Sequence, residues 1–139
     1  MSDDLFQEIR FGGELLAILV KRKFIDKLYK TTIFTPDKWR VQVGYNVHKS
    51  KDIVPSHYHI RGDNKSGDIG VEALYVVKGS IKVYIYHPKS RALVSSFIAD
   101  EGDLVIMKSG HKIEYLKDSI LLQVKEGPYP GMEKDKVKI

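Results

Sequence analysis

The chain has 139 residues and a mass of 15.9 kDa, which is the size of one ordinary domain. Its residues are 42% hydrophobic and 29% charged, as in a globular protein, and the absence of cysteine excludes disulfides, cysteine-ligated metals and a thiol nucleophile. The net charge of +5 predicts a solvated basic face, with attraction of a phosphate-bearing small molecule or an acidic polymer as the sharper alternative. Aromatic and basic residues do not interleave as in nucleic-acid-binding surfaces, so we expect no nucleic-acid partner.

No part of the sequence has the length or composition of a membrane segment or a secretory signal. The longest apolar run, residues 15–20, is far shorter than the roughly 20 residues of a membrane-spanning helix. The first four residues, Met-Ser-Asp-Asp, are acidic where a signal peptide is basic. We therefore expect a cytoplasmic protein that does not enter a membrane.

The predicted elements begin with a short helix, capped by Ser2 or Asp3, that runs to Ile9 and ends at Gly12-Gly13. The rest of the chain consists of short β-type runs that are bounded by turn residues. We predict strands at residues 14–20, 33–35, 39–48, 53–60, 71–77, 81–86, 93–99, 104–107, 113–116 and 120–125. About ten short strands without long intervening helices predict an all-β sandwich or barrel.

The strand at residues 39–48 alternates between apolar and polar side chains. Val41, Val43, Tyr45 and Val47 share one face, and Arg40, Gln42, Asn46 and His48 share the other. His48 therefore belongs to the polar face and is interpreted as an ordinary surface residue. The same interpretation applies to His87, which lies in a Tyr-His-Pro turn.

Two histidines, His57 and His59, form the most informative pattern in the sequence. Residues at positions i and i+2 of a strand project from the same face, about 7 Å apart, so both imidazoles can converge on one metal ion. The alternative is a pair of partly exposed histidines on an edge strand. Because cysteine is absent, any metal must be held by histidine nitrogens and by oxygen ligands.

Glu72 and His111 are the other candidate ligands. Glu72 opens an apolar strand and shares a face with Leu74 and Val76, so its carboxylate lies either at a solvated rim or beside a buried partner. His111 directly follows Gly110, at the end of a short apolar strand that begins after Gly102. Taken alone, His111 is a turn histidine.

Together these residues resemble the two motifs of the cupin superfamily. The order His57, His59, Glu72, Gly79 is similar to its first motif, and Gly102, Gly110 and His111 are similar to its second. The resemblance covers residues 39–127 and implies a small jelly-roll barrel with a divalent metal on His57, His59, Glu72 and His111. It also implies a single cupin domain over residues 1–139, with an N-terminal segment at 1–12, the cupin core at 39–127 and a C-terminal arm at 128–139.

The sequence departs from the cupin pattern at two places. Twelve residues separate His59 from Glu72, where cupins have only a few, and residues 61–70 form a loop that is either a lid or a longer turn. In the second motif Lys108 replaces the expected proline, and Ile113 stands where the histidine is usual. His111 can take over that role only if the turn is reshaped.

The C-terminal sequence, Gly-Pro-Tyr-Pro-Gly followed by Asp-Lys, is similar to a group of small single-domain cupins without an assigned reaction, some of them linked to surface-polysaccharide sugar biosynthesis. Cupins of this size usually form homodimers, so a homodimer is expected. The arm at residues 128–139 covers a sheet edge, crosses to the partner or frays.

The resemblance favours a metal-binding protein that isomerises or epimerises a sugar or sugar-phosphate derivative, a small polar metabolite, with Mn, Fe, Co, Ni or Zn as the metal. Leu74, Val76, Val83 and Ile85 are expected to form the apolar walls of the site. Tyr45, Tyr58, Tyr75 and Lys125 are conceivable acid–base or orienting groups, and none is assigned a catalytic role. The alternatives are a metal-free sugar-nucleotide isomerase or epimerase with a histidine base, and a binding module without turnover.

Overall fold

The computed structural model describes residues 5–59, 69–128 and 136–138. The predicted helix caps, most of the predicted mouth loop at 61–70 and most of the arm at 128–139 lie outside these ranges. The chain divides into two compact units, Met1–Lys30 and Thr31–Ile139, which are considered separately.

The N-terminal unit is a β-hairpin followed by one helical turn. Strand β1 (Phe6–Phe11) pairs antiparallel with β2 (Glu14–Val20), and the helix α1 covers only Arg22–Ile25. The predicted helix ending at Ile9 is therefore wrong. Gly12 and Gly13 have φ angles of 58° and 81°, the conformation of a tight two-residue hairpin turn, so these glycines join two strands where they were expected to end a helix.

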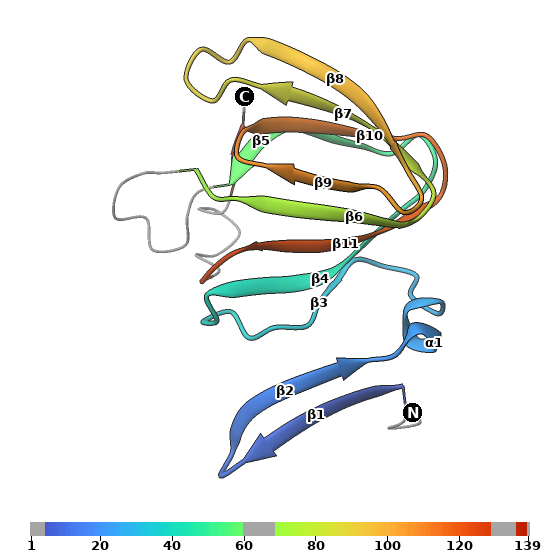
Figure 1. Ribbon diagram of the computed structural model, residues 1–139, viewed down its shortest axis with the longest axis vertical. Helices are drawn as coiled ribbons and strands as arrows, with labels where there is room; N and C mark the ends of the chain where they lie inside the picture. The colour runs from blue at the N-terminus through green and yellow to red at the C-terminus, as the bar shows by residue number, and fades with distance from the viewer. Residues whose placement is uncertain (1–4, 60–68, 129–135, 139) are drawn as a thin grey trace. The chain divides into compact units, whose positions relative to one another are not determined.

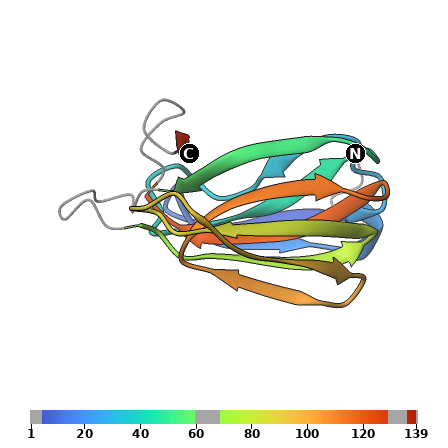
Figure 2. The same ribbon diagram turned by 90° about the horizontal axis from the view of Figure 1, so that it is seen from above.

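The second unit consists of antiparallel strands arranged in two five-stranded sheets (Figure 1). One sheet has the order β12-β5-β10-β7-β8 and the other has the order β3-β4-β11-β6-β9. The strands are β3 (Thr32–Ile33), β4 (Val41–His48), β5 (Ile53–His59), β6 (Glu72–Lys78), β7 (Ser80–Tyr86), β8 (Leu93–Asp100), β9 (Leu104–Met107), β10 (Gly110–Tyr115), β11 (Ser119–Glu126) and β12 (Lys136–Lys138). The two sheets form the layers seen from above in Figure 2, which confirms the all-β prediction.

The hydrophobic core of this unit is built by alternate residues of strands from both sheets. Because side chains of a strand point alternately to its two faces, each of these strands contributes every second residue. The buried apolar residues are Leu74, Val76, Ile81, Val83, Ala99, Val105, Met107, Ile113, Tyr115 and Leu121.

The turn between β6 and β7 depends on Gly79. Its φ angle is +100°, a conformation that L side chains rarely adopt. An added Cβ would also overlap the Ser119 hydroxyl and lie 2.6 Å from the Asp118 carbonyl oxygen. This glycine thereby lets β6 and β7 connect closely against the start of β11.

The short strand β12 pairs with the outer edge of β5. Lys136 lies opposite His59 and Lys138 lies opposite His57 in this ladder. This part of the C-terminal arm thus covers the edge of the strand that carries both histidines. Within the described ranges, no helix has the length and apolarity needed to cross a membrane.

Candidate metal centre

A β-bulge in β5 sets the direction of the first two histidines. His57 lies opposite His111 on β10, whereas Val54 lies opposite Ile113, so three steps along β5 match two along β10. The irregularity includes Pro55, which cannot donate a hydrogen bond to a sheet ladder. As a result Val54, His57 and His59 all line the same pocket.

The carbonyl oxygen of Pro55 also fixes the tautomer of His57. It lies 2.7 Å from His57 Nδ1, and because a carbonyl can only accept, Nδ1 carries the proton. The Nε2 lone pair of His57 then faces the centre of the group, as in metal-ligating histidines whose other ring nitrogen binds a carbonyl. His57 Nε2 lies 3.3 Å from His59 Nε2.

His111 completes a buried group of three histidines. It lies on β10 next to His57, with the two ring centroids 4.5 Å apart. One ring nitrogen from each of His57, His59 and His111 can be chosen so that all three lie within 4.8 Å of one another. The turn before β10 therefore brings His111 into the group without a histidine at Ile113, which lines the same pocket.

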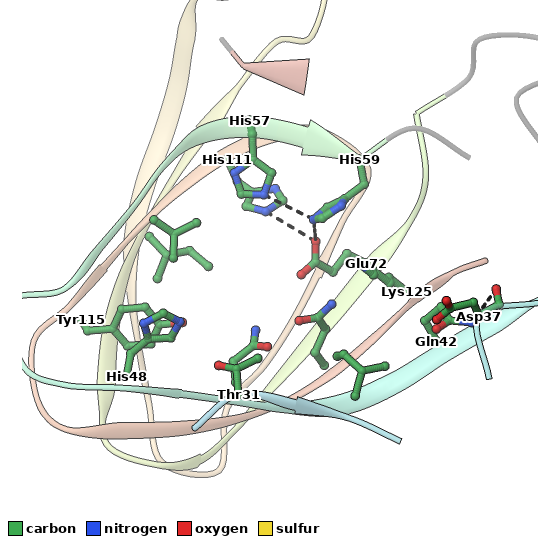
Figure 3. A pocket seen from close by; sticks show the side chains of 15 residues that line it. Thr31, Asp37, Gln42, His48, His57, His59, Glu72, His111, Tyr115 and Lys125 are labelled. Carbon is green, nitrogen blue, oxygen red and sulfur yellow. Dashed lines mark hydrogen bonds and ion pairs between the residues drawn. The ribbon is translucent and has the colours of Figure 1, made fainter. Parts of the chain in front are cut away.

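Glu72 reaches this group from the opposite sheet. Its Oε2 lies 2.8 Å from His59 Nε2 and 3.5 Å from His111 Nε2, and its side chain is only 5% exposed (Figure 3). Of the two alternatives for Glu72, a solvated rim or a buried partner, the structure shows the second. All four residues expected as ligands thus meet in one place.

The charges around Glu72 favour its ionised form. Burial alone raises the pKa of a carboxyl group, but the hydrogen bond from His59 and the positive charges of His59, His111 and Lys125 lower the pKa of Glu72 to about 2. The carboxylate is therefore negatively charged wherever the protein is folded near neutral pH. An ionised carboxylate beside imidazole nitrogens combines two ligand types that bind divalent transition metals.

The four residues lie at one end of a pocket of about 550 Å³ between the two sheets. Its walls combine polar and apolar side chains (Figure 3). The remaining lining residues are Thr31, Ile33, Asp37, Gln42, Asn46, His48, Val54, Ile113, Tyr115, Gln123 and Lys125. This volume is within the range of small-molecule sites, roughly 300–1,000 Å³.

The interpretation of His48 as an ordinary surface residue is wrong. It lines the pocket, and its ring stacks on that of Tyr115 with 4.4 Å between centroids, while Nδ1 lies 3.3 Å from Asp52 Oδ2. The polar face of β4 points into the pocket, whereas Val41 on the other face is 48% exposed. Alternation revealed the two faces of this strand and could not tell which one was inside.

The expected apolar walls are also wrong. Leu74, Val76 and Val83 are fully buried in the core, and Ile85 packs against it, but none of the four lines the pocket. The apolar lining comes instead from Ile33, Val54 and Ile113.

Of the conceivable acid–base or orienting groups whose side chains are described, only Lys125 lines the pocket. Tyr75 is 41% exposed on the outer face of β6, and Tyr45 lies outside the lining. The side chain of Tyr58 is not among those described. Tyr115, which the sequence did not single out, forms the far wall beside His48. Burial, followed by the negative charges of Glu72 and Asp52, raises the pKa of Tyr115, so its phenol stays protonated.

The donor set fits a divalent transition metal. Imidazole nitrogens and a carboxylate oxygen suit Mn, Fe, Co, Ni and Zn, and the four groups are buried and come from three strands in two sheets. In metal-binding histidines, the ring nitrogen that does not bind the metal usually donates a hydrogen bond that fixes the ring. His57 Nδ1 donates such a bond to the carbonyl oxygen of Pro55.

Comparison with known proteins finds similarity in structure only. No protein-family model matches the chain, and no curated protein does. A single-substitution variant of the oxalate decarboxylase of B. subtilis superposes with a TM-score of 0.55 at 20% identity, covering 72% of this chain and 24% of that one. This chain thus spans about a quarter of the length of that enzyme. Mn(II) centres are described for the B. subtilis protein.

Two further structures give similar values. KdgF from Halomonas sp. has a TM-score of 0.53 at 15% identity, covering 69% of this chain and 76% of that one. An oxalate oxidase has a TM-score of 0.52 at 18% identity, covering 66% of this chain and 44% of that one. These neighbours are cupins, so the chain has the cupin-type jelly-roll fold. The buried group of His57, His59 and His111 is of a kind that could hold a metal ion. Similarity to the small group with the Gly-Pro-Tyr tail stays a prediction.

Proposed function

We propose that this chain is a metal-binding cupin that isomerises or epimerises a small sugar or sugar-phosphate derivative, with the ion held by His57, His59, His111 and Glu72. The observation that carries the proposal is the buried group of three histidines, which faces a carboxylate at the end of a polar pocket. Imidazole nitrogens and a carboxylate oxygen at this spacing are the ligand types that divalent transition metals take.

The role of the ion follows from its general chemistry. A bound divalent metal acts as a Lewis acid that polarises a carbonyl oxygen, which acidifies the neighbouring C–H bond on which isomerases and epimerases act. The chain's own residues then have to bind the substrate, orient it and keep water away.

The pocket has suitable groups for these tasks. The amides of Asn46 and Gln123 line it and make no hydrogen bond to the described residues, so they can bind hydroxyl groups of a substrate. Val54, Ile113 and Ile33 exclude water from one side. One structural neighbour, an oxalate oxidase, is described in complex with glycolate, which is a small hydroxy acid.

The first experiment is elemental analysis of protein purified without chelator and without immobilised-metal resin, before and after loading with Mn, Fe, Co, Ni or Zn. We expect nearly one equivalent of metal in the wild type and almost none in a His57→Ala/His59→Ala variant. His48→Asn is the matched control, because it removes a pocket histidine that lies outside the three-histidine group.

The outcomes distinguish the remaining functions. A wild type that stays metal-free after loading would contradict the proposal and leave a histidine-based isomerase or a binding module. Equal loss of metal in the His48 variant would show that the site is not the one described. With metal present, the reaction itself is tested by exchange with D2O of the proton next to the carbonyl group, which is on C2 of an aldose phosphate and on C1 or C3 of a ketose phosphate.

A further inference from the structure

We propose that the edge strand β8 is the surface through which two copies of this chain form a dimer. The two β8 strands pair antiparallel, so that the β12-β5-β10-β7-β8 sheets of both copies become continuous. The proposal does not depend on the metal site or on the proposed reaction. It follows from the uncovered edge of β8, its composition and the charges at its two ends.

Strand β8 forms an edge of its sheet that no other described strand covers (Figure 1). It pairs with β7 along one side over residues 93–100. The backbone N–H and C=O groups on its other side are therefore available to a further strand. The opposite edge of this sheet is β12, which has three residues, two of them lysines, and such short, charged strands resist pairing.

The composition of β8 favours pairing with another strand. Residues 93–99 include no charged residue and no proline, the residues that commonly prevent edge-to-edge contact. Val94 and Ile98 are 65% and 57% exposed, and Phe97 is 38% exposed. The ladder with β7 is irregular only next to Tyr86, at the beginning of β8. The strand thus presents a nearly regular, apolar edge to solvent, an arrangement that marks an interaction site.

The charges that flank β8 identify a second copy of this chain as the partner. Lys89 and Arg91 precede the strand, whereas Asp100, Glu101 and Asp103 end or follow it, and all five residues are exposed. Antiparallel pairing places the basic start of one β8 beside the acidic end of the other, and it does so at both ends of the paired strands. Arg91 and Glu101 make no ion pair within the described part of the chain, so both charges are available for this contact.

The register that matches the strand to itself is centred on Ser96. Residues directly opposite each other in an antiparallel pair lie on the same face of the sheet. With Ser96 opposite Ser96 of the second copy, Val94 lies opposite Ile98, and Arg91 lies opposite Glu101. Two exposed apolar side chains and two opposite charges are thereby matched on each side of the centre. Such a contact is isologous, so it closes at two copies.

The size of this contact sets the expected affinity. Six paired residues at about 3.3 Å each give a contact about 20 Å long, which buries on the order of 500 Å² per copy. This area is smaller than the roughly 800 Å² per copy of a standard interface. We therefore expect a dimer that depends on protein concentration, with a dissociation constant in about the micromolar range.

The test measures the mass of the full-length protein by light scattering and sedimentation equilibrium, at concentrations from about 5 to about 200 µM. The wild type is compared with Val94→Lys/Ile98→Lys, which places like charges opposite each other in the proposed register. It is also compared with Val94→Glu/Ile98→Lys, which places opposite charges there. Ile53→Lys is the matched control, because Ile53 is also 57% exposed but lies on β5, away from the β8 edge. Circular dichroism and Tm check the folding of each variant.

We expect the wild type and the Ile53 variant to be dimers at about 200 µM. The like-charge variant should have a dissociation constant at least about tenfold higher, and the opposite-charge variant should return to within about fivefold of the wild type.

The absence of cysteine from the chain allows a second measurement of the register. Residue 96 faces itself across the proposed dimer, so Ser96→Cys should form a disulfide-linked dimer under mild oxidation. Ser95→Cys is the control, because the two copies of residue 95 lie diagonally, about 7–8 Å apart, too far for a disulfide.

Four results would overturn the proposal. A monomeric wild type at about 200 µM would leave β8 to a partner other than a second copy. A like-charge variant that dimerises as well as the wild type would place the interface elsewhere on the chain. An opposite-charge variant that stays monomeric, or equal disulfide formation by the two cysteine variants, would exclude the antiparallel register centred on Ser96.

Discussion

The phenol of Tyr115 gives the sharpest test of the described packing. Its side chain is 1% exposed, and its hydroxyl makes no hydrogen bond within the described part of the chain. A buried hydroxyl without a partner costs about 1–3 kcal/mol relative to its hydrated state. Tyr115→Phe removes that cost and keeps the ring that stacks on His48. We therefore expect the variant to be more stable than the wild type by about 1 kcal/mol, or about 4 °C in Tm for a chain of this size.

Tyr84 provides a matched control for the same chemical change. Its hydroxyl donates to Glu114 Oε1 at 2.8 Å, so Tyr84→Phe removes a hydrogen bond that is made. We expect this variant to be less stable than the wild type, so the two Tyr→Phe substitutions should have opposite signs. Urea denaturation of the metal-free proteins, followed by fluorescence and circular dichroism, measures both changes on the same scale.

A loss of stability in Tyr115→Phe of about 1 kcal/mol or more would refute this reasoning, because it would show that the phenol has a hydrogen-bond partner. Measuring metal content in the same variants separates packing from function. Tyr115 lies outside the three-histidine group, so neither substitution should lower the metal content.

Four further predictions concern acid, the turn at Gly79, the terminal strand and the oligomeric state. Lowering the pH from 7 to 4 should release the metal, because a histidine must be neutral to bind a metal and a free imidazole has a pKa of about 6.5. The lowered pKa of Glu72, about 2, means that its carboxylate contributes stability above its unfolded pKa and loses it only as the pH falls towards 2. Release should therefore follow the histidines, and metal still bound at pH 4 in a dialysis experiment would count against a histidine site. Gly79→Ala should lower the free energy of unfolding by about 2–4 kcal/mol, from its positive φ and the overlap with Ser119. Gly102→Ala, with φ +90° and nothing within 4 Å of the added Cβ, should cost less, and equal Tm losses would contradict the packing argument. Deleting residues 129–139 removes β12 from the edge of β5, the strand that carries His57 and His59. Metal affinity should fall about tenfold, as it does when the groups that hold metal-binding residues in place are lost. An unchanged metal affinity would contradict this role of β12. Light scattering of the full-length chain tests the expected homodimer, since a particle of 15.9 kDa would contradict it.

The fold class could be predicted because it depends on local patterns, and so could part of the grouping of side chains at the candidate site. His57 and His59 share a face at the spacing that a strand requires, and Glu72 was correctly grouped with Leu74 and Val76. The bulge at Pro55 could not be predicted, because it depends on how β5 pairs with β10. It is nevertheless the feature that aims His57 and supplies the carbonyl that fixes its tautomer.

The errors share a physical cause. The Phe6–Phe11 strand pairs with β2, and a short segment shows no sign of its pairing partner when it is considered alone. The polar face of β4 was assigned to the surface because burial usually follows hydrophobicity. That rule fails where the interior of the barrel is a polar pocket, and it therefore missed His48.

A different pattern in the sequence does locate the pocket. Inward residues change from apolar to polar along four strands: Leu74 to Glu72 on β6, Ile113 to His111 on β10, Leu121 to Lys125 on β11, and Val54 to His59 on β5. The polar residue comes first in β6 and β10 and last in β5 and β11. Since β6 is antiparallel to β11, and β10 to β5, these opposite ends of the strands meet at the same end of each sheet. Alternating hydrophobic residues therefore predict which face of each strand points inward. The end of the strand at which the inward residues become polar predicts where the hydrophobic core ends and the pocket begins.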